Sequence, residues 1–106
     1  MNRPHRRYEV LLPLKFNDGS DVPESLLADT LRDLEQQFGP ISCESQEILG
    51  LWHHQGRTYK DKQVRVFVDV PDLPEDREFF VGFKERLKER FQQIDIWVTT
   101  HPLEVI

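Results

Sequence analysis

The side chains best suited to chemistry in this sequence are histidines near aromatic residues. His53 and His54 are adjacent and shortly precede Tyr59, and His101 lies four residues after Trp97. A neutral imidazole can bind a metal ion or haem iron, and imidazole also titrates near neutral pH. These residues therefore offer two kinds of chemistry, ligation of a metal and acid–base catalysis.

Metal ligation is the less favoured of the two. Adjacent residues on a strand point to opposite faces, so His53 and His54 would hold one ion only if a turn brought them together. Either would meet His101 only if its segment reached across the fold. We therefore expect exposed loop histidines, with no metal site and no cofactor.

His101 is the best candidate for a catalytic residue. If the last strand continues through it, His101 shares a face with Trp97 and Thr99, where an apolar surface would influence its protonation. Pro102 could end the strand before that point. Cys43 has no sequence neighbour that would activate a thiolate, and we interpret it as a small buried residue.

Common catalytic motifs are absent from the sequence. It contains no glycine-rich phosphate loop and no GxSxG, HExxH, CxxC or EF-hand pattern. Its single cysteine cannot form an internal disulfide or a two-cysteine zinc site. Several enzyme classes are thereby removed, and a non-enzymatic role is favoured.

The composition is that of one soluble domain. The 106 residues are 38% hydrophobic and 31% charged, and the formal net charge is −5. The acidic balance argues against electrostatic capture of nucleic acid or of an anionic membrane. No apolar run approaches the roughly 20 residues of a membrane span. We expect a cytoplasmic protein without a nucleic-acid or membrane partner.

The strongest structural pattern lies at 62–70, KQVRVFVDV, where four valines alternate with Arg65, Phe67 and Asp69. This period of two predicts a strand with one face in the core. Segments 8–16 and 94–100 show the same alternation. Their expected core residues are Tyr8, Val10, Leu12, Leu14, Phe16, Ile94, Ile96 and Val98.

Two amphipathic helices and a hairpin complete the pattern. The first helix is predicted to start near Asp21, with Glu24 as a capping-box partner, and to stop at Gly39. The second is predicted to start at 72–76. Between them, 41–51 and 59–70 form an antiparallel hairpin, with a turn at Gly56 and a bulge at Gly50. The helical stripes are Leu27, Leu31, Leu34 and Phe38, then Phe80, Phe83, Leu87 and Phe91.

The order β-α-β-β-α-β predicts an α+β domain with the ferredoxin-like topology, a four-stranded antiparallel sheet with two helices on one face. This domain would span residues 8–106, after a mobile tail at 1–7. The first and third strands would be central. Pro13 is the one misfit, because a proline in a central strand removes a ladder hydrogen bond.

The face of the sheet away from the helices is predicted to be unusually apolar. Leu11 and Phe67 would lie side by side on the central strands, with Trp97 beside Leu11. Three occupants could cover such a patch: a second copy, the chain's own C-terminal segment or hairpin, or a ligand or peptide. We favour a homodimer, in which Arg65 and Asp69 pair across the interface; a small molecule could also bind there.

At the level of the fold, the element order and this apolar face resemble the dimeric α+β barrel group. That resemblance implies two subunits packed sheet to sheet around a cavity, which in some members is an enzymatic or haem-binding pocket. The stretches YEVLLPLKF, LWHHQGRTYKDK and RFQQIDIWVTTHPLEVI also resemble a small bacterial family to which we attach no activity.

The expected function is therefore a small binding or interaction domain that dimerises through its open face. One alternative is a monooxygenase-like or haem-binding enzyme of the dimeric α+β barrel type, using His101. Another is a metabolite-sensing regulatory domain. RNA recognition is disfavoured, because the RNP1 pattern is absent and Leu11 takes the place of a stacking aromatic.

Overall fold

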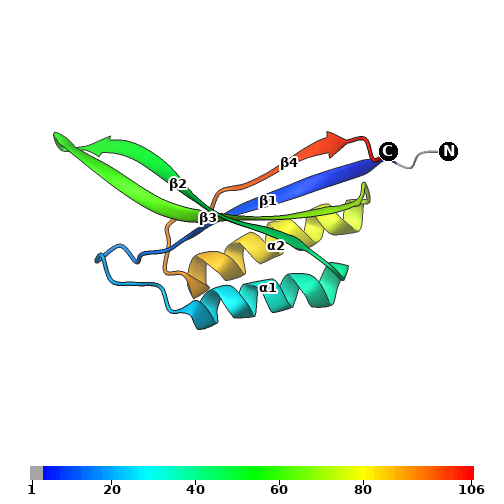
Figure 1. Ribbon diagram of the computed structural model, residues 1–106, viewed down its shortest axis with the longest axis horizontal. Helices are drawn as coiled ribbons and strands as arrows, with labels where there is room; N and C mark the ends of the chain where they lie inside the picture. The colour runs from blue at the N-terminus through cyan, green and yellow to red at the C-terminus, as the bar shows by residue number, and fades with distance from the viewer. Residues whose placement is uncertain (1–3) are drawn as a thin grey trace.

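The computed structural model describes residues 4–106, and within the hairpin the side chains of 43–54 and 57–61 lie outside the description. A four-stranded antiparallel sheet, in the order β2-β3-β1-β4, has both helices on one face (Figure 1). The α+β class and the ferredoxin-like order of elements are confirmed. The elements are β1 (His5–Pro13), α1 (Glu24–Phe38), β2 (Ser42–His54), β3 (Arg57–Pro71), α2 (Pro74–Arg90) and β4 (Val98–Leu103).

The core lies between the sheet and the helices. Val10 pairs with Val66 and Tyr8 with Val68 across the central strands. Because side chains alternate along a strand, the even-numbered residues at 8–12 of β1 and 64–70 of β3 turn to the helices. The buried hydrophobic residues are Tyr8, Val10, Leu12, Leu34, Val64, Val66, Val68, Val70, Phe80, Phe83, Leu87, Phe91 and Ile96.

The two helices meet each other through aromatic and polar contacts. Phe80 stacks on Phe38, with ring centroids 5.4 Å apart. Near the end of α2, the Arg90 guanidinium donates to Thr30 Oγ1 at 2.9 Å and to Asp33 Oδ2 at 2.7 Å. Thr30 is fully buried and its hydroxyl donates to the Leu26 carbonyl. This cluster fixes α1 against α2.

The first strand begins and ends earlier than expected. It includes His5, Arg6 and Arg7, so the prediction of a mobile tail over 1–7 is wrong for these residues; residues 1–3 lie outside the description. Pro13 is the last residue of β1, and the next amide, that of Leu14, still donates to the Lys62 carbonyl at 3.0 Å, so the proline does not break the pairing with β3 and the misfit disappears.

The start of the first helix was also predicted incorrectly. Asp21 does not cap the helix; its carboxylate pairs with Lys15, which forms an isolated bridge to it. The helix starts at Glu24, after Pro23, with no side-chain cap. Likewise, no capping bond is formed at the start of α2, where Pro74 is the first helical residue.

The final strand is shifted toward the C-terminus. Gln92 has a positive φ of 54°, and Ile94 is 92% exposed in the connection that follows. Ile94 is therefore not a core residue, whereas Ile96 is. Pro102 lies within β4, because an edge strand tolerates a proline.

The hairpin projects beyond the rest of the sheet. The β1–β3 ladder ends at Pro13 and Gln63, but β2 and β3 remain paired up to the turn at Gln55 and Gly56 (Figure 1). Both turn residues have positive φ, as a two-residue type I′ turn requires. We call residues 50–61 the β2–β3 arm.

The bulge in the hairpin lies elsewhere than predicted. Gly50 pairs regularly with Asp61, and the register shifts between Glu44 and Ile48. Within the described part of the chain, no helix is both long and apolar enough to cross a membrane.

Candidate binding face

The sheet surface opposite the helices is formed by alternate residues of β1, β3 and the β4 segment. These residues turn outward because their neighbours in the strands are buried in the core. We call this surface the open face. Its central residues are Arg7, Glu9, Leu11, Arg65, Phe67, Asp69, Trp97, Thr99 and His101.

An ion pair covers the aromatic ring at its centre. Arg7 lies opposite Asp69 and donates from Nε to Oδ1 at 2.7 Å and from Nη2 to Oδ2 at 2.9 Å. The same guanidinium lies over the Phe67 ring, 4.2 Å from its centroid. Because the guanidinium covers its ring, Phe67 is half-buried. The hydrogen bond from Arg7 also holds the pKa of Asp69 below its usual value.

Leu11 and Phe67 are not directly opposite each other, which corrects the expected apolar row. Leu11 pairs with Arg65, and Phe67 with Glu9. Arg65 and Glu9 form an ion pair with 3.8 Å between Nε and Oε2. Alternation in a sequence indicates which face a residue joins, but not the register between two strands. The open face is thus amphipathic, with charged pairs between its apolar groups.

Trp97 lies next to Leu11, as predicted. The Leu11 amide donates to the Trp97 carbonyl at 3.0 Å. Since Ile96 is buried and Val98 is half-buried against the core, Trp97 turns to the opposite side, where it is 62% exposed. Thr99 follows on the same face, opposite Glu9.

His101 is an exposed residue opposite Arg7. Because β4 continues to Leu103, His101 shares the open face with Trp97 and Thr99. Its surroundings are more polar than expected, since it is close enough to Asp69 to help lower the pKa of that carboxyl. A catalytic role for His101 stays a prediction.

His101 lies far along the sheet from the strand positions of His53 and His54. His101 of β4 and Asp69 of β3 both pair with Arg7 of β1, so they lie at the same level of the sheet. His54 of β2 instead pairs with Arg57 of β3, next to the hairpin turn. Twelve residues of β3 separate these levels, roughly 40 Å along the strand at about 3.3 Å per residue. The side chains of Cys43, Trp52, His53, His54 and Tyr59 lie outside the described residues. In the described part, no cluster of His, Cys, Asp or Glu side chains is placed to hold a metal ion.

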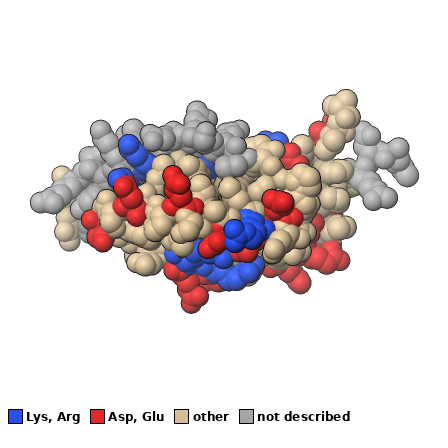
Figure 2. Space-filling view, turned by 60° about the horizontal axis from the view of Figure 1, so that its bottom comes forward, with Lys and Arg blue, Asp and Glu red and all other residues tan. Residues whose placement is uncertain are grey.

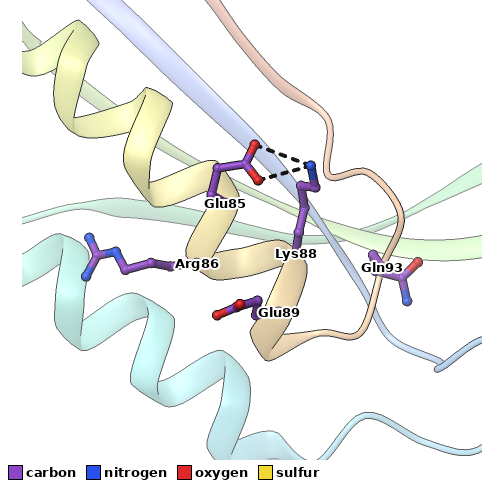
Figure 3. A pocket seen from close by; sticks show the side chains of 5 residues that line it. All are labelled: Glu85, Arg86, Lys88, Glu89 and Gln93. Carbon is purple, nitrogen blue, oxygen red and sulfur yellow. Dashed lines mark hydrogen bonds and ion pairs between the residues drawn. The ribbon is translucent and has the colours of Figure 1, made fainter.

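One surface hollow lies on α2, away from the open face. Glu85, Arg86, Lys88, Glu89 and Gln93 line it (Figure 3). Lys88 pairs with Glu85 at 3.1 Å, and Arg86 points away from this pair and lies over the Phe83 ring. Figure 2 shows acidic and basic side chains mixed over the helical side. This hollow is a solvated, charge-paired helix surface.

A second hollow was missed by sequence reasoning. It is a cleft of about 140 Å³ between α2 and β4, with Tyr8 among its lining residues. Tyr8 fits the core pattern of β1, so nothing in that pattern pointed to a cleft. The one feature of the sequence that could have indicated this cleft is the phenolic hydroxyl, because Tyr8 is the only tyrosine in the predicted core set.

Comparison with known proteins defines the class of fold. No family model matches the sequence, and no curated protein matches it. A phage SAM lyase in complex with S-methyl-5'-thioadenosine is similar in structure, with a TM-score of 0.69 and 16% identity over 95% of this chain and 88% of that chain.

Two CutA1 structures are also similar. CutA1 from Oryza sativa has a TM-score of 0.65 and 10% identity, covering 99% of this chain and 84% of that one. The divalent cation tolerance protein CutA1 from Thermus thermophilus has a TM-score of 0.60 and 14% identity, covering 93% and 84%. At these identities the likeness shows the fold alone, a small ferredoxin-like α+β domain.

Proposed function

We propose that this chain is a binding module that pairs with a second copy through its open face. The observation that carries the proposal is the position of Trp97, a large aromatic side chain that is 62% exposed beside the half-buried Leu11. Exposed apolar groups gathered on one surface are typical of interaction sites, and tryptophan is enriched among the residues that dominate binding energy.

The charges of the open face support pairing with an identical surface. Arg7 and Asp69, and Arg65 and Glu9, place both signs close together. In a two-fold interface each residue of one copy faces residues of the same patch on the other. A patch with paired charges of both signs can face itself without a net repulsion.

The β2–β3 arm gives a second line of support. An isolated two-stranded ribbon is only marginally stable in water, and β1 pairs with β3 only as far as Gln63. A second copy lying on the sheet would provide the arm with a surface to contact. Self-association would therefore stabilise both the open face and the arm.

Light scattering after size-exclusion chromatography tests this proposal with two matched substitutions. Trp97→Lys places a charge on the open face, while Ile94→Lys changes an even more exposed side chain in the preceding connection. Because both residues are exposed, both variants should keep the native circular dichroism. We expect Trp97→Lys to have the mass of one chain, 12.6 kDa, and Ile94→Lys to remain a dimer. A dimer that survives Trp97→Lys would overturn the use of this face.

The enzymatic alternative depends on the same association. His101 would border a cavity only if the second copy enclosed the space above Trp97 and Thr99. Its position on the open face beside Trp97 is compatible with that arrangement, and the role stays a prediction. A metabolite-binding role is the second candidate, and the cleft beside Tyr8 is the observation that favours it.

A further inference from the structure

The cleft between α2 and β4 combines apolar walls with polar groups. The ring of Tyr8 stacks on Phe80, with centroids 4.2 Å apart and nearly parallel planes. Val81 and Val98 add aliphatic surface, and Thr100 belongs to the adjacent edge strand. The remaining lining residues are Arg77, Lys84 and Thr99.

The hydroxyl of Tyr8, one of the residues that line the cleft, is unusual. Tyr8 is 3% exposed, and its hydroxyl has no hydrogen-bond partner among the described residues. Buried hydroxyl groups are nearly always hydrogen-bonded, because an unsatisfied one loses its interactions with water. Phenylalanine would fill the same stacking position without this cost. The hydroxyl therefore remains available to a partner other than the described residues.

The charged residues that line the cleft are both cationic, which favours an anionic partner. Arg77 and Lys84 bring two cations to the cleft. Lys84 is paired with Asp95 at 3.1 Å, whereas Arg77 has no ion pair among the described residues. Burial raises the pKa of Tyr8; the charges of Arg6 and Arg77 lower it, and those of Asp76 and Asp72 raise it further. At neutral pH the hydroxyl remains protonated and can donate to an anion beside a guanidinium.

The size and walls of the cleft restrict the rest of the ligand. An enclosed apolar cavity of about 150 Å³ is large enough to bind benzene, and this cleft, which is open to solvent on one side, has a volume of about 140 Å³. We propose that it binds a small organic acid, whose apolar body packs against Phe80 and Val98 and whose carboxylate accepts hydrogen bonds from the Tyr8 hydroxyl and Arg77. This site lies between α2 and β4 and shares only Thr99 with the residues named for the open face.

Benzoate is the probe for this site, and benzyl alcohol is its neutral counterpart. Titration of the isotope-labelled protein by NMR should shift resonances of residues 77–84 and 98–100 in a saturable way with benzoate. Benzyl alcohol should bind more weakly. Shifts that remain linear with concentration, or that map to other elements, would overturn the proposal.

Three substitutions assign the roles of the polar groups. Tyr8→Phe and Arg77→Gln should each weaken benzoate binding about tenfold or more, because each removes a hydrogen bond to a charged group. Arg32→Gln, on the exposed surface of α1, is the control and should leave binding unchanged.

Thermal unfolding separates a ligand site from a structural role of Tyr8. If the hydroxyl has no partner in the free protein, Tyr8→Phe should keep or raise the Tm while weakening benzoate binding. A lowered Tm would mean that the hydroxyl already has a hydrogen-bond partner within the fold. Undiminished benzoate binding would mean that the hydroxyl does not contact the ligand. Either result would contradict the proposal. Trp97→Lys should retain benzoate binding, so the two proposals can fail independently.

Discussion

Arg7 and Asp69 lie directly opposite each other on the two central strands and are joined by two hydrogen bonds, of 2.7 and 2.9 Å. The guanidinium simultaneously covers the Phe67 ring. One side chain thus links β1 to β3 and shields an aromatic group on the open face. The pair should contribute to both the stability and the acid sensitivity of the protein.

Asp69→Asn should lower the free energy of unfolding at neutral pH by about 0.5–1 kcal/mol, the range for a well-oriented surface pair. Arg7 lowers the pKa of Asp69 in the folded protein. The stabilisation is therefore present above the unfolded pKa of about 4 and is lost as the pH falls through the folded value. Urea unfolding from pH 7 to pH 3 should show the wild type and Asp69→Asn converging at acid pH. A difference that is constant over this range would exclude the ionised pair as its source.

Phe83 should be among the residues that matter most for stability. It is completely buried where α2 meets the sheet, so Phe83→Ala should cost about 3–5 kcal/mol. Val81 lies on the same helix but is 66% exposed, and Val81→Ala should change stability by less than about 0.5 kcal/mol. Chemical unfolding monitored by circular dichroism measures both; similar losses would contradict the assigned faces of α2.

Thr30→Val tests the contact between the two helices. The substitution keeps the side-chain shape but removes the oxygen that accepts from Arg90, so we expect a loss of about 1–2 kcal/mol. Arg32→Gln breaks an exposed pair with Asp29 and should cost at most about 0.5 kcal/mol. If the Thr30 variant were as stable as the wild type in urea, the hydrogen bond from Arg90 would contribute nothing.

Two glycine substitutions should act in opposite directions. Gly56 has a φ of 78° in the turn of the β2–β3 arm, so Gly56→Ala should destabilise the hairpin by about 1 kcal/mol. Gly82 lies within α2, where an added Cβ meets nothing within 4 Å, so Gly82→Ala should stabilise by about 0.5–1 kcal/mol. Thermal unfolding should order the variants accordingly, and a stabilising Gly56→Ala would contradict the turn geometry.

The fold could be predicted because alternation and helical periodicity are local properties. The valines of 64–70 and the phenylalanines of α2 defined their buried faces correctly. The register could not be predicted, because pairing Leu11 with Arg65 rather than Phe67 depends on contacts between distant segments. The cleft was missed for the same reason: Tyr8 and Arg77 are 69 residues apart in the sequence and share a wall only after β1 and α2 pack.

The helix starts and the last strand also depended on tertiary contacts. Asp21 fits a capping position, but in the fold its carboxylate pairs with Lys15. Ile94 continues the alternation of the last strand, but the chain turns at Gln92 and leaves Ile94 exposed. A local pattern does not report such competing contacts.

The most direct test of the proposed pairing is the solution mass of the wild-type protein, measured by light scattering over a dilution series. Association through the open face predicts about twice the 12.6 kDa of one chain at high concentration, with a fall toward the monomer mass on dilution and a parallel change in Trp97 fluorescence, isolated by a Trp52→Phe background. A mass of one chain at every concentration would contradict it.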